Sequence, residues 1–223
     1  DEALSAARDD AGDDLIAAFA ADLSTDGGCA AVAAHCAEHG VLPDILVNNA
    51  GIAFAGRADH VPRDQWEKLV QLNLLGPMRL CDLFLPGMIE RGSGHIVNIS
   101  SIAGWTGDEG LSSYCASKFG LRGFGISLAA DLENTGVKVT NVYPCFSRTP
   151  ILDSPQHGYE EHRTVPEYLI SDPAHVVSRI MQGVRRNRVH VFPDKYARLI
   201  HYLTRFAPWL LRILDRRVQA DSR

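Results

Sequence analysis

Residues 94–101 read GHIVNISS, and residues 44–51 read DILVNNAG. Each stretch is an apolar run that turns polar at its end, with serines closing the first and asparagines closing the second. Unalternated apolar runs of this length are typical of strands buried on both faces of a parallel sheet. Because ligands bind at the carboxyl ends of such strands, both polar ends are predicted to line one crevice.

The same strand signal recurs outward from this pair, at residues 15–23, 137–144 and 188–193. Helical periodicity fills the intervals, over residues 26–39, 64–91, 112–134 and 173–186. Pro77 and Pro86 predict kinks or breaks in the second of these helices. The alternation predicts an α/β protein with a doubly wound, mostly parallel sheet in three layers, α/β/α.

Composition supports one ordinary soluble domain. The chain has 223 residues, 46% of them hydrophobic and 22% charged, and no apolar run reaches the ~20 residues that span a bilayer. The net charge of −5 argues against a nucleic-acid partner. Residues 185–223 nevertheless hold ten Lys and Arg against three Asp and Glu. We therefore expect one Rossmann-like domain over residues 1–193 and a basic amphipathic helical tail over residues 194–223.

The cysteines and histidines predict neither a disulfide framework nor a metal site. Five cysteines, an odd number without C-x-x-C spacing, fit reduced thiols and a cytoplasmic location. The histidines include no H-E-x-x-H, and His157 and His162 fall in a polar stretch that is expected to be a loop.

Tyr114 and Lys118 are the first candidate catalytic pair. Positions i and i+4 share one helix face, so the phenol and the ammonium are able to point into one site. A tyrosine has a pKa of about 10, and a nearby cation lowers it. Tyr114 would then serve as a general acid or base for a hydroxyl–carbonyl interconversion. Taken alone, the spacing equally fits a surface tyrosine beside a solvated lysine.

The pair is one of four motifs that occur in order: N-N-A-G at 48–51, N-x-x-G at 73–76, I-V-N-x-S-S-x-A-G at 96–104 and Y-x-A-S-K at 114–118. Together they resemble the short-chain dehydrogenase/reductase family. The resemblance runs from about residue 1 to 193 and is most specific between 44 and 149. It implies an NAD(P)-dependent oxidoreductase, using NAD or NADP, that interconverts a secondary alcohol and a ketone or aldehyde by hydride transfer.

The resemblance also implies four catalytic roles. Tyr114 would exchange the proton with the substrate oxygen, and Lys118 would lower the pKa of Tyr114 and hold the nicotinamide ribose. Ser101 would hydrogen-bond the substrate oxygen. Asn73 would anchor a water that connects Lys118 to bulk solvent.

Cofactor contacts are implied at further positions. Asp22 would contact the adenine, and Ser147 and Thr149 would hold the nicotinamide carboxamide. The adenosine ribose would lie against Asn49, Ala50 and Gly51. Tyr114 and Lys118 belong to this cofactor set as well.

The sequence departs from the family pattern in two places. Nothing matches the family's T-G-x-x-x-G-x-G phosphate loop, so about 40 residues, the length of a βαβ unit, are expected to precede Asp1. Without them neither NAD nor NADP preference is readable. Pro144-Cys145 replaces the usual Pro-Gly. Close-packing roles inside a helix are expected instead for Gly120, Gly123 and Gly125.

Four questions stay open at the level of sequence: the substrate, the role of the tail, the oligomeric state and whether the protein is an enzyme. Residues 150–172, with Trp105 as a wall, predict a pocket for an apolar alcohol or carbonyl substrate. Residues 196–218, divided by Pro208, would cover that pocket, pack on a second subunit or lie in a membrane interface. A homodimer or homotetramer is implied by the resemblance. The alternative to an enzyme is a catalytically inactive binding or scaffold protein on the same fold.

Overall fold

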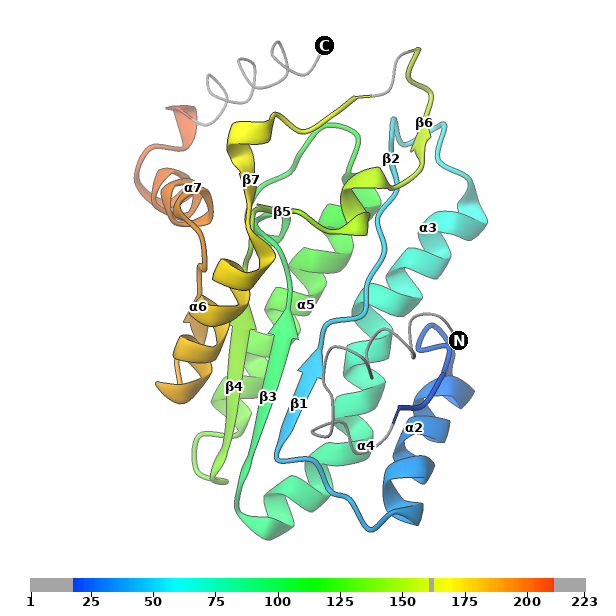
Figure 1. The fold of residues 1–223 in the computed structure, drawn as a ribbon, viewed down its shortest axis with the longest axis vertical. Coiled ribbons are helices and arrows are strands. Elements are labelled where there is room, and N and C mark those ends of the chain that lie inside the picture. The colour runs from blue at the N-terminus through cyan, green and yellow to red at the C-terminus, as the bar shows by residue number, and fades with distance from the viewer. Residues whose placement is uncertain (1–17, 161–162, 211–223) are drawn as a thin grey trace.

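The computed structural model describes residues 18–160 and 163–210. Its main sheet has four parallel strands in the order β1-β3-β4-β8, drawn in Figure 1. These strands are β1 (Ile45–Asn48), β3 (Gly94–Ile99), β4 (Val137–Val142) and β8 (His190–Val191). The parallel α/β architecture and four of the five predicted strands are therefore confirmed.

The strand predicted at residues 15–23 is wrong in its described part, because residues 18–22 belong to no strand. These residues form no β-sheet pairing with any of the described strands. The chain turns instead: the N–H and hydroxyl of Thr25 both donate to the carbonyl of Asp22, and Thr25 then caps α2. Residues 15–17 lie outside the described residues.

The main helices follow the predicted intervals: α2 (Asp26–Glu38), α3 (Arg63–Val70), α4 (Gly76–Arg91), α5 (Ser112–Asp131), α6 (Pro173–Arg185) and α7 (Lys195–Phe206). Short 3-10 turns are η3 (Ile102–Gly104), η4 (Pro150–Asp153) and η5 (Glu167–Leu169). Two small parallel pairs join β2 (Ala55–Gly56) to β6 (Gln156–His157), and β5 (Phe146–Ser147) to β7 (Ile170–Ser171).

The predicted interruption of residues 64–91 is a π-helical turn, η2 (Gln71–Leu75), between α3 and α4. Pro77 stands in the first turn of α4, where its missing N–H has no intrahelical partner to lose. Pro86 was expected to kink or break the helix, yet α4 continues through it to Arg91. The buried side chains of Phe84 and Met88, on either side of Pro86, hold this helix against the core.

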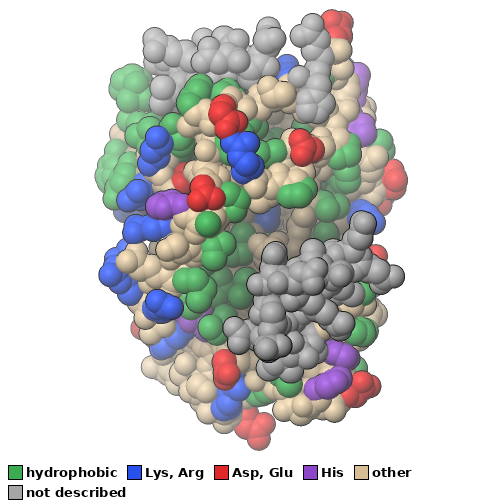
Figure 2. Space-filling model, viewed as in Figure 1, with side chains coloured by type: hydrophobic (Ala, Val, Ile, Leu, Met, Phe, Trp, Pro, Cys, Tyr) green, Lys and Arg blue, Asp and Glu red, His purple; other side chains and the backbone are tan. Residues whose placement is uncertain are grey.

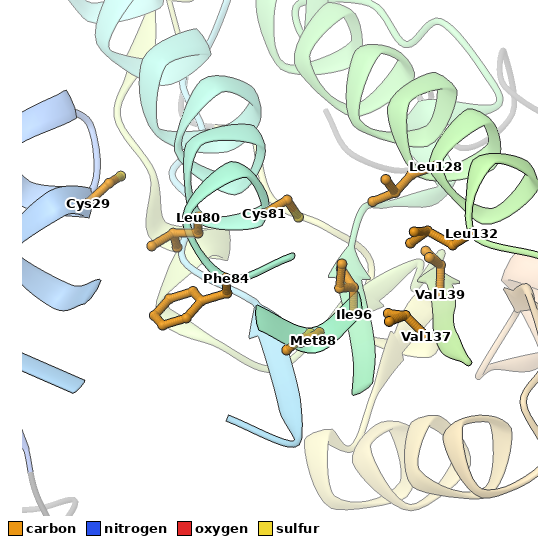
Figure 3. Close-up of a cluster of buried hydrophobic side chains, with 10 residues drawn as sticks. All are labelled: Cys29, Leu80, Cys81, Phe84, Met88, Ile96, Leu128, Leu132, Val137 and Val139. Atoms are coloured by element: carbon orange, nitrogen blue, oxygen red, sulfur yellow. The ribbon is translucent and has the colours of Figure 1, made fainter. Parts of the chain in front are cut away.

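Neighbouring residues of β3 point to opposite faces of the sheet and so separate two cores. Ile96 packs with side chains from α4 and α5, a cluster shown in Figure 3. Val97, on the other face, packs with Val184 of α6. Helices therefore cover both faces, which gives the three-layer α/β/α arrangement.

The glycines of α5 do not all have the packing role expected of them. An added Cβ on Gly120 would lie 2.8 Å from Leu74, and one on Gly125 would lie 1.8 Å from Oδ1 of Asn141. At Gly123 the same Cβ would meet nothing within 4 Å. The close-packing prediction is thus confirmed at Gly120 and Gly125 and is wrong at Gly123.

The C-terminal segment returns to the body of the protein through α7. Ala197, in the first turn of this helix, is fully buried, and α7 contacts η3 beside the predicted site. The helix ends at Phe206, and Pro208 begins a new helical turn that runs to Leu210, so the predicted division is present in the described part. Residues 211–218 of the predicted tail lie outside the described residues. Within residues 18–160 and 163–210, no helix is long and apolar enough to cross a membrane.

All five cysteines are free thiols. Cys29 and Cys81 belong to the core of Figure 3. Cys115 is buried as well, and desolvation raises the pKa of its thiol. These buried cysteines therefore act as small apolar groups.

Candidate active site

Ser101 and Tyr114 meet where β3 ends and α5 begins. Ser101 caps η3, and its Oγ accepts a hydrogen bond of 3.1 Å from the N–H of Ala103. Its hydroxyl also hydrogen-bonds the Tyr114 phenol. Tyr114 lies in the first turn of α5, half-buried, so its hydroxyl stands beside the carboxyl end of the sheet.

Lys118 lies one turn further along α5 and is almost completely buried, with 5% of its surface exposed. Its Nζ donates to the carbonyl of Ile99 at 2.9 Å and lies 5.6 Å from the centre of the Tyr114 ring. The backbone carbonyl of Lys118 accepts from the Ser100 hydroxyl at 3.0 Å. Burial lowers the pKa of Lys118 to about 8, because the ammonium has lost most of its water.

The pKa of Tyr114 moves in the direction opposite to the expected one. Desolvation raises it to about 12, and the hydrogen bond from Ser101 offsets only part of that rise. The expectation that Lys118 lowers this pKa is therefore wrong for the chain alone. The ammonium faces the carbonyl of Ile99, and it is not among the groups that set the phenol's pKa. At neutral pH the phenol keeps its proton.

Asn73 lies at the centre of the π-helical turn η2 and is 1% exposed. Its amide binds both backbone groups of Ile52: Nδ2 donates to the carbonyl at 2.8 Å, and Oδ1 accepts from the N–H at 2.9 Å. π-helical turns are frequent at functional sites because they re-aim one side chain. Here the turn fixes the chain directly after residues 48–51.

Gly51 lies between the Asn73 amide and the Lys118 ammonium. An added Cβ on Gly51 would lie 3.2 Å from Oδ1 of Asn73 and 3.7 Å from Nζ of Lys118. The structure therefore brings Asn73, Ser101, Tyr114 and Lys118 to one edge of the sheet. Ile52 was missed by sequence reasoning, since a backbone partner leaves no side-chain signal.

The four residues of the N-N-A-G motif divide into a buried part and an exposed part. Asn48 is 5% exposed, and its Nδ2 donates to Asn98 at 2.9 Å. The amide of Asn98 in turn donates to Asn141 at 3.2 Å, so a polar ladder crosses β1, β3 and β4. The exposed part is the loop of Asn49, Ala50 and Gly51 at the carboxyl end of β1.

Ser147 and Thr149 follow β4 on the other side of the site. The Oγ of Ser147 is buried and has no hydrogen-bond partner in the described structure. Thr149 caps η4 and lines a pocket of about 430 Å³. This pocket is lined by Arg148, Thr149, Pro150, Leu152, Asp153, Thr164, Val165 and Ile170. Most of the pocket therefore comes from the loop predicted to hold a substrate.

Asp22 is not brought to this cluster. Its carboxylate is exposed and accepts hydrogen bonds from the N–H and hydroxyl of Ser24, at 3.0 and 2.6 Å, which lower its pKa. Within the described residues its side chain bonds to Ser24 alone. Asp22 was expected at the end of a strand, and the absence of that strand from residues 18–22 leaves it in a turn.

Asp194 is a buried carboxylate that sequence reasoning missed. Its Oδ2 accepts from the N–H of Cys145 at 2.9 Å, and its Oδ1 accepts from the N–H of Ala197 at 2.7 Å. One side chain thus ties the loop after β4 to the start of α7. The signal was the position of an Asp before a helical pattern, which is typical of an N-cap.

Trp105, expected to wall the substrate pocket, lies in an aromatic cluster under α7. Its ring stands edge-on to His201 and Tyr143, at centroid distances of 4.6 and 5.6 Å, and the Arg122 guanidinium lies 3.4 Å above it. The indole packs between Tyr143, which follows β4, and His201 of α7, so it links this helix to the chain next to Ser101.

Comparison with known proteins identifies the class. Residues 1–160 match the family model of the short chain dehydrogenases. Epidermal retinol dehydrogenase 2 from Homo sapiens is 31% identical over 203 residues, which are 89% of this chain and 64% of that protein. With its parallel α/β sheet and its Ser-Tyr-Lys-Asn cluster, the chain belongs to the short-chain dehydrogenase/reductase family.

Solved structures agree on the fold. A short-chain dehydrogenase from Streptomyces avermitilis superposes with a TM-score of 0.79 and 28% identity, over 95% of this chain and 82% of that one. A short-chain dehydrogenase from Sphingobium yanoikuyae, solved in complex with NADPH, superposes with a TM-score of 0.72 and is 26% identical in sequence. The match covers 99% of this chain and 81% of that one. The chain spans between 18% and 64% of the length of the curated relatives first matched.

Proposed function

We propose that this protein is an NAD(P)-dependent oxidoreductase that interconverts a secondary alcohol and a ketone or aldehyde. The observation that carries the proposal is the convergence of the Ser101 hydroxyl, the Tyr114 phenol and the buried Lys118 ammonium at one sheet edge. A structural role does not account for this buried lysine, which bonds the carbonyl of Ile99 but has no carboxylate partner among the described residues, because its desolvation costs free energy.

The residues present fit a nicotinamide cofactor at two points. The buried Oγ of Ser147 has no partner in the described structure, so it is free to bond a carboxamide. Gly51 leaves the space beside Lys118 free of a side chain, which suits the close approach of a ribose. When bound, NAD or NADP supplies or accepts the hydride. The cofactor would be held by Asn49, Ala50, Gly51, Ser147 and Thr149. The proposed contact of Asp22 with the adenine rests on the family pattern alone.

In carbonyl reduction Tyr114 donates its phenolic proton to the substrate oxygen, and in alcohol oxidation its phenolate takes that proton back. The Ser101 hydroxyl donates to the same oxygen and stabilises the charge that develops there. Lys118 stays protonated below its pKa of about 8, and its ammonium is the group we propose to hold the nicotinamide ribose. Asn73 holds the backbone that frames this arrangement and is the proposed anchor of a water leading to Lys118.

The substrate we propose is an apolar alcohol or carbonyl compound, bound in the loop that follows Thr149. Leu152, Val165 and Ile170 give its pocket of about 430 Å³ an apolar lining beside Arg148 and Asp153. The human relative is named a retinol dehydrogenase, and a further structure with 26% identity and a TM-score of 0.69 is a bulky-bulky ketone specific alcohol dehydrogenase from Comamonas testosteroni. Both names fit an apolar substrate class.

Tyr114→Phe tests the mechanism. Turnover, followed by NAD(P)H absorbance over a panel of apolar secondary alcohols and ketones, should fall about 10²–10⁴-fold because the proton donor is gone. Fluorescence titration should show cofactor binding retained. Tyr143→Phe removes a phenol that bonds His190 outside the site and is the matched control, with turnover close to that of the unsubstituted chain. Equal turnover in Tyr114→Phe would remove Tyr114 from the mechanism.

The same titration separates the enzyme from a non-catalytic scaffold on this fold. Binding of NADH or NADPH, together with turnover that depends on Tyr114, supports the enzyme. Binding of neither, by the full-length protein, favours the scaffold. We further propose a cytoplasmic homodimer or homotetramer, and a peripheral membrane contact made through residues 196–218.

A further inference from the structure

A second pocket, of about 390 Å³, lies between α6, β8 and α7, on the opposite side of β4 from β1 and its nucleotide-side loop. Four arginines line it: Arg179 and Arg186 on the α6 side, Arg188 before β8, and Arg198 on α7. The Nη1 of Arg179 donates to Gln182, and the Nε of Arg198 donates to a backbone carbonyl. The pocket lining has no Asp or Glu in the part of the chain that the structure describes.

This concentration of positive charge is not matched by ion pairs. None of these four arginines takes part in an ion pair among residues 18–160 and 163–210. Arginines that gather around a concave site without carboxylates suit a phosphate group, because the guanidinium fork binds two of its oxygens. The remaining lining includes His190 and His201, which are polar but are held neutral near pH 7 since burial lowers the pKa of each.

The outer face of α7 stands beside this pocket and is apolar. Leu199, Tyr202 and Phe206 recur at the spacing of one helix face and are 49%, 60% and 73% exposed. Trp209, in the helical turn that follows Pro208, is 64% exposed, and Tyr202 also lines the pocket. In Figure 2 Lys and Arg side chains gather along the left edge, next to a group of hydrophobic side chains at the upper left.

A row of arginines beside exposed Leu, Tyr, Phe and Trp is the composition of an interfacial membrane contact. Aromatic side chains insert at the headgroup level while arginines hold anionic headgroups. A second copy packed on this same face by twofold symmetry would bring the same arginines toward one another. Charge complementarity therefore favours a lipid surface.

We propose that the surface of Arg179, Arg186, Arg188 and Arg198 binds the phosphate of an anionic phospholipid, while Leu199, Tyr202, Phe206 and Trp209 enter the bilayer interface. The inference rests on the membrane contact proposed above and gives it a lipid class and a binding site. It is independent of the dehydrogenase chemistry. In this orientation α7 faces the membrane. The loop at Cys145, which Asp194 links to the start of α7, would then lie on the membrane side of the site.

The test is co-sedimentation of the full-length protein with vesicles of phosphatidylcholine, with and without phosphatidylglycerol. We expect binding only where phosphatidylglycerol is present, and a blue shift of tryptophan emission that Trp209→Phe removes. Arg186→Gln/Arg188→Gln should weaken binding about 30-fold, from about 1 kcal/mol for each arginine near an anionic surface. Arg63→Gln/Lys138→Gln removes two exposed charges elsewhere and should change it less than threefold.

Equal binding to both kinds of vesicle, or equal losses in the two double variants, would refute the headgroup site. No binding to either vesicle would refute the membrane contact as well. Binding of soluble glycerol phosphate without vesicle binding would mean that the pocket serves a free phosphate. Self-association without lipid that Phe206→Ser abolishes would mean that a second copy covers α7. Turnover and NAD(P)H binding, measured without lipid, should be unchanged in both double variants. A failure of the oxidoreductase proposal would appear in these two measurements and not in the sedimentation assay.

Discussion

The carboxylate of Asp194 accepts a hydrogen bond of 2.9 Å from the backbone N–H of Cys145, across 49 residues of sequence. Its other oxygen caps α7 through Ala197, and the carboxylate is 3% exposed. A residue of the C-terminal segment therefore fixes the loop that leads from β4 to Ser147 and Thr149. This one side chain therefore links the start of α7 to the loop of the candidate cofactor site.

Asp194→Ala should lower the free energy of unfolding by about 2–4 kcal/mol, because two buried N–H groups lose their acceptor. Urea denaturation measures this. Asp172→Ala is the matched control: Asp172 also caps a helix, α6, through one exposed bond to Ala174, and its loss should cost about 1 kcal/mol. Equal losses in the two variants would mean that the bond to Cys145 contributes nothing.

Asn73→Ala should cost about 2–4 kcal/mol of stability and reduce turnover at least tenfold, because both backbone groups of Ile52 lose their partner beside Gly51. Gln71→Ala changes a side chain of the same π-helical turn that bonds Arg79, and should cost less than about 1 kcal/mol. Thermal melts and steady-state kinetics on both variants make the comparison. A melt of Asn73→Ala that overlays that of Gln71→Ala would contradict the role of Asn73 as a backbone clamp.

These two buried side chains show where sequence reasoning succeeds and where it ends. Asn73 was predicted from the N-x-x-G motif at 73–76, whose role is implied by the resemblance to the family. Its contact with Ile52 was not predicted, because it depends on how a π-helical turn aims the amide. Asp194 carried only a helix-cap signal. Its second partner, Cys145, is visible only once β4 and β8 pair, which brings the chain after each strand together.

In the sheet, too, elements that depend on local sequence patterns were predicted correctly and contacts that depend on the fold were not. Apolar runs that end in polar residues predicted β1, β3 and β4. The strands β3 and β4 are mostly buried, which leaves a continuous apolar signal. Burial on both faces was expected for β1 too, but β1 is the edge strand of the described sheet, and its Ile45 and Val47 are 45% and 54% exposed. Residues 18–22 carried a similar run without a described strand to pair with, and they form irregular chain that leads into a turn at Asp22–Thr25. The pKa of Tyr114 was misjudged for a related reason: spacing reveals a neighbouring charge, but only the folded structure reveals the loss of water around the phenol.

Lys118 should make stability depend on pH. Its pKa is about 8 in the folded chain against an ordinary value of 10.5. Between these values the unfolded chain binds more protons, so stability should rise as pH increases from about 8 to about 10. The gain should be absent in Lys118→Met, and Lys138→Met, at an exposed position of β4, should retain it. Urea denaturation at several pH values gives the slope, and parallel slopes in all three proteins would refute the depressed pKa.

Two glycines of α5, two positions apart, should respond to alanine in opposite directions. At Gly123, which is exposed, an added Cβ meets nothing within 4 Å. Alanine there should stabilise the chain by up to about 1 kcal/mol through its higher helix propensity. At Gly125 the Cβ would lie 1.8 Å from Oδ1 of Asn141 and 2.8 Å from Nδ2 of Asn98.

Alanine at Gly125 must therefore push α5 away from the polar ladder between β3 and β4, at a cost of about 1–3 kcal/mol or more. Because Tyr114 and Lys118 stand on the same helix, turnover should fall with stability in Gly125→Ala and stay unchanged in Gly123→Ala. Melting temperatures and turnover of the two variants, measured side by side, test both statements. A destabilised Gly123→Ala would mean that another surface covers this face of α5, and a neutral Gly125→Ala would mean that the helix does not approach the sheet as closely as the structure indicates.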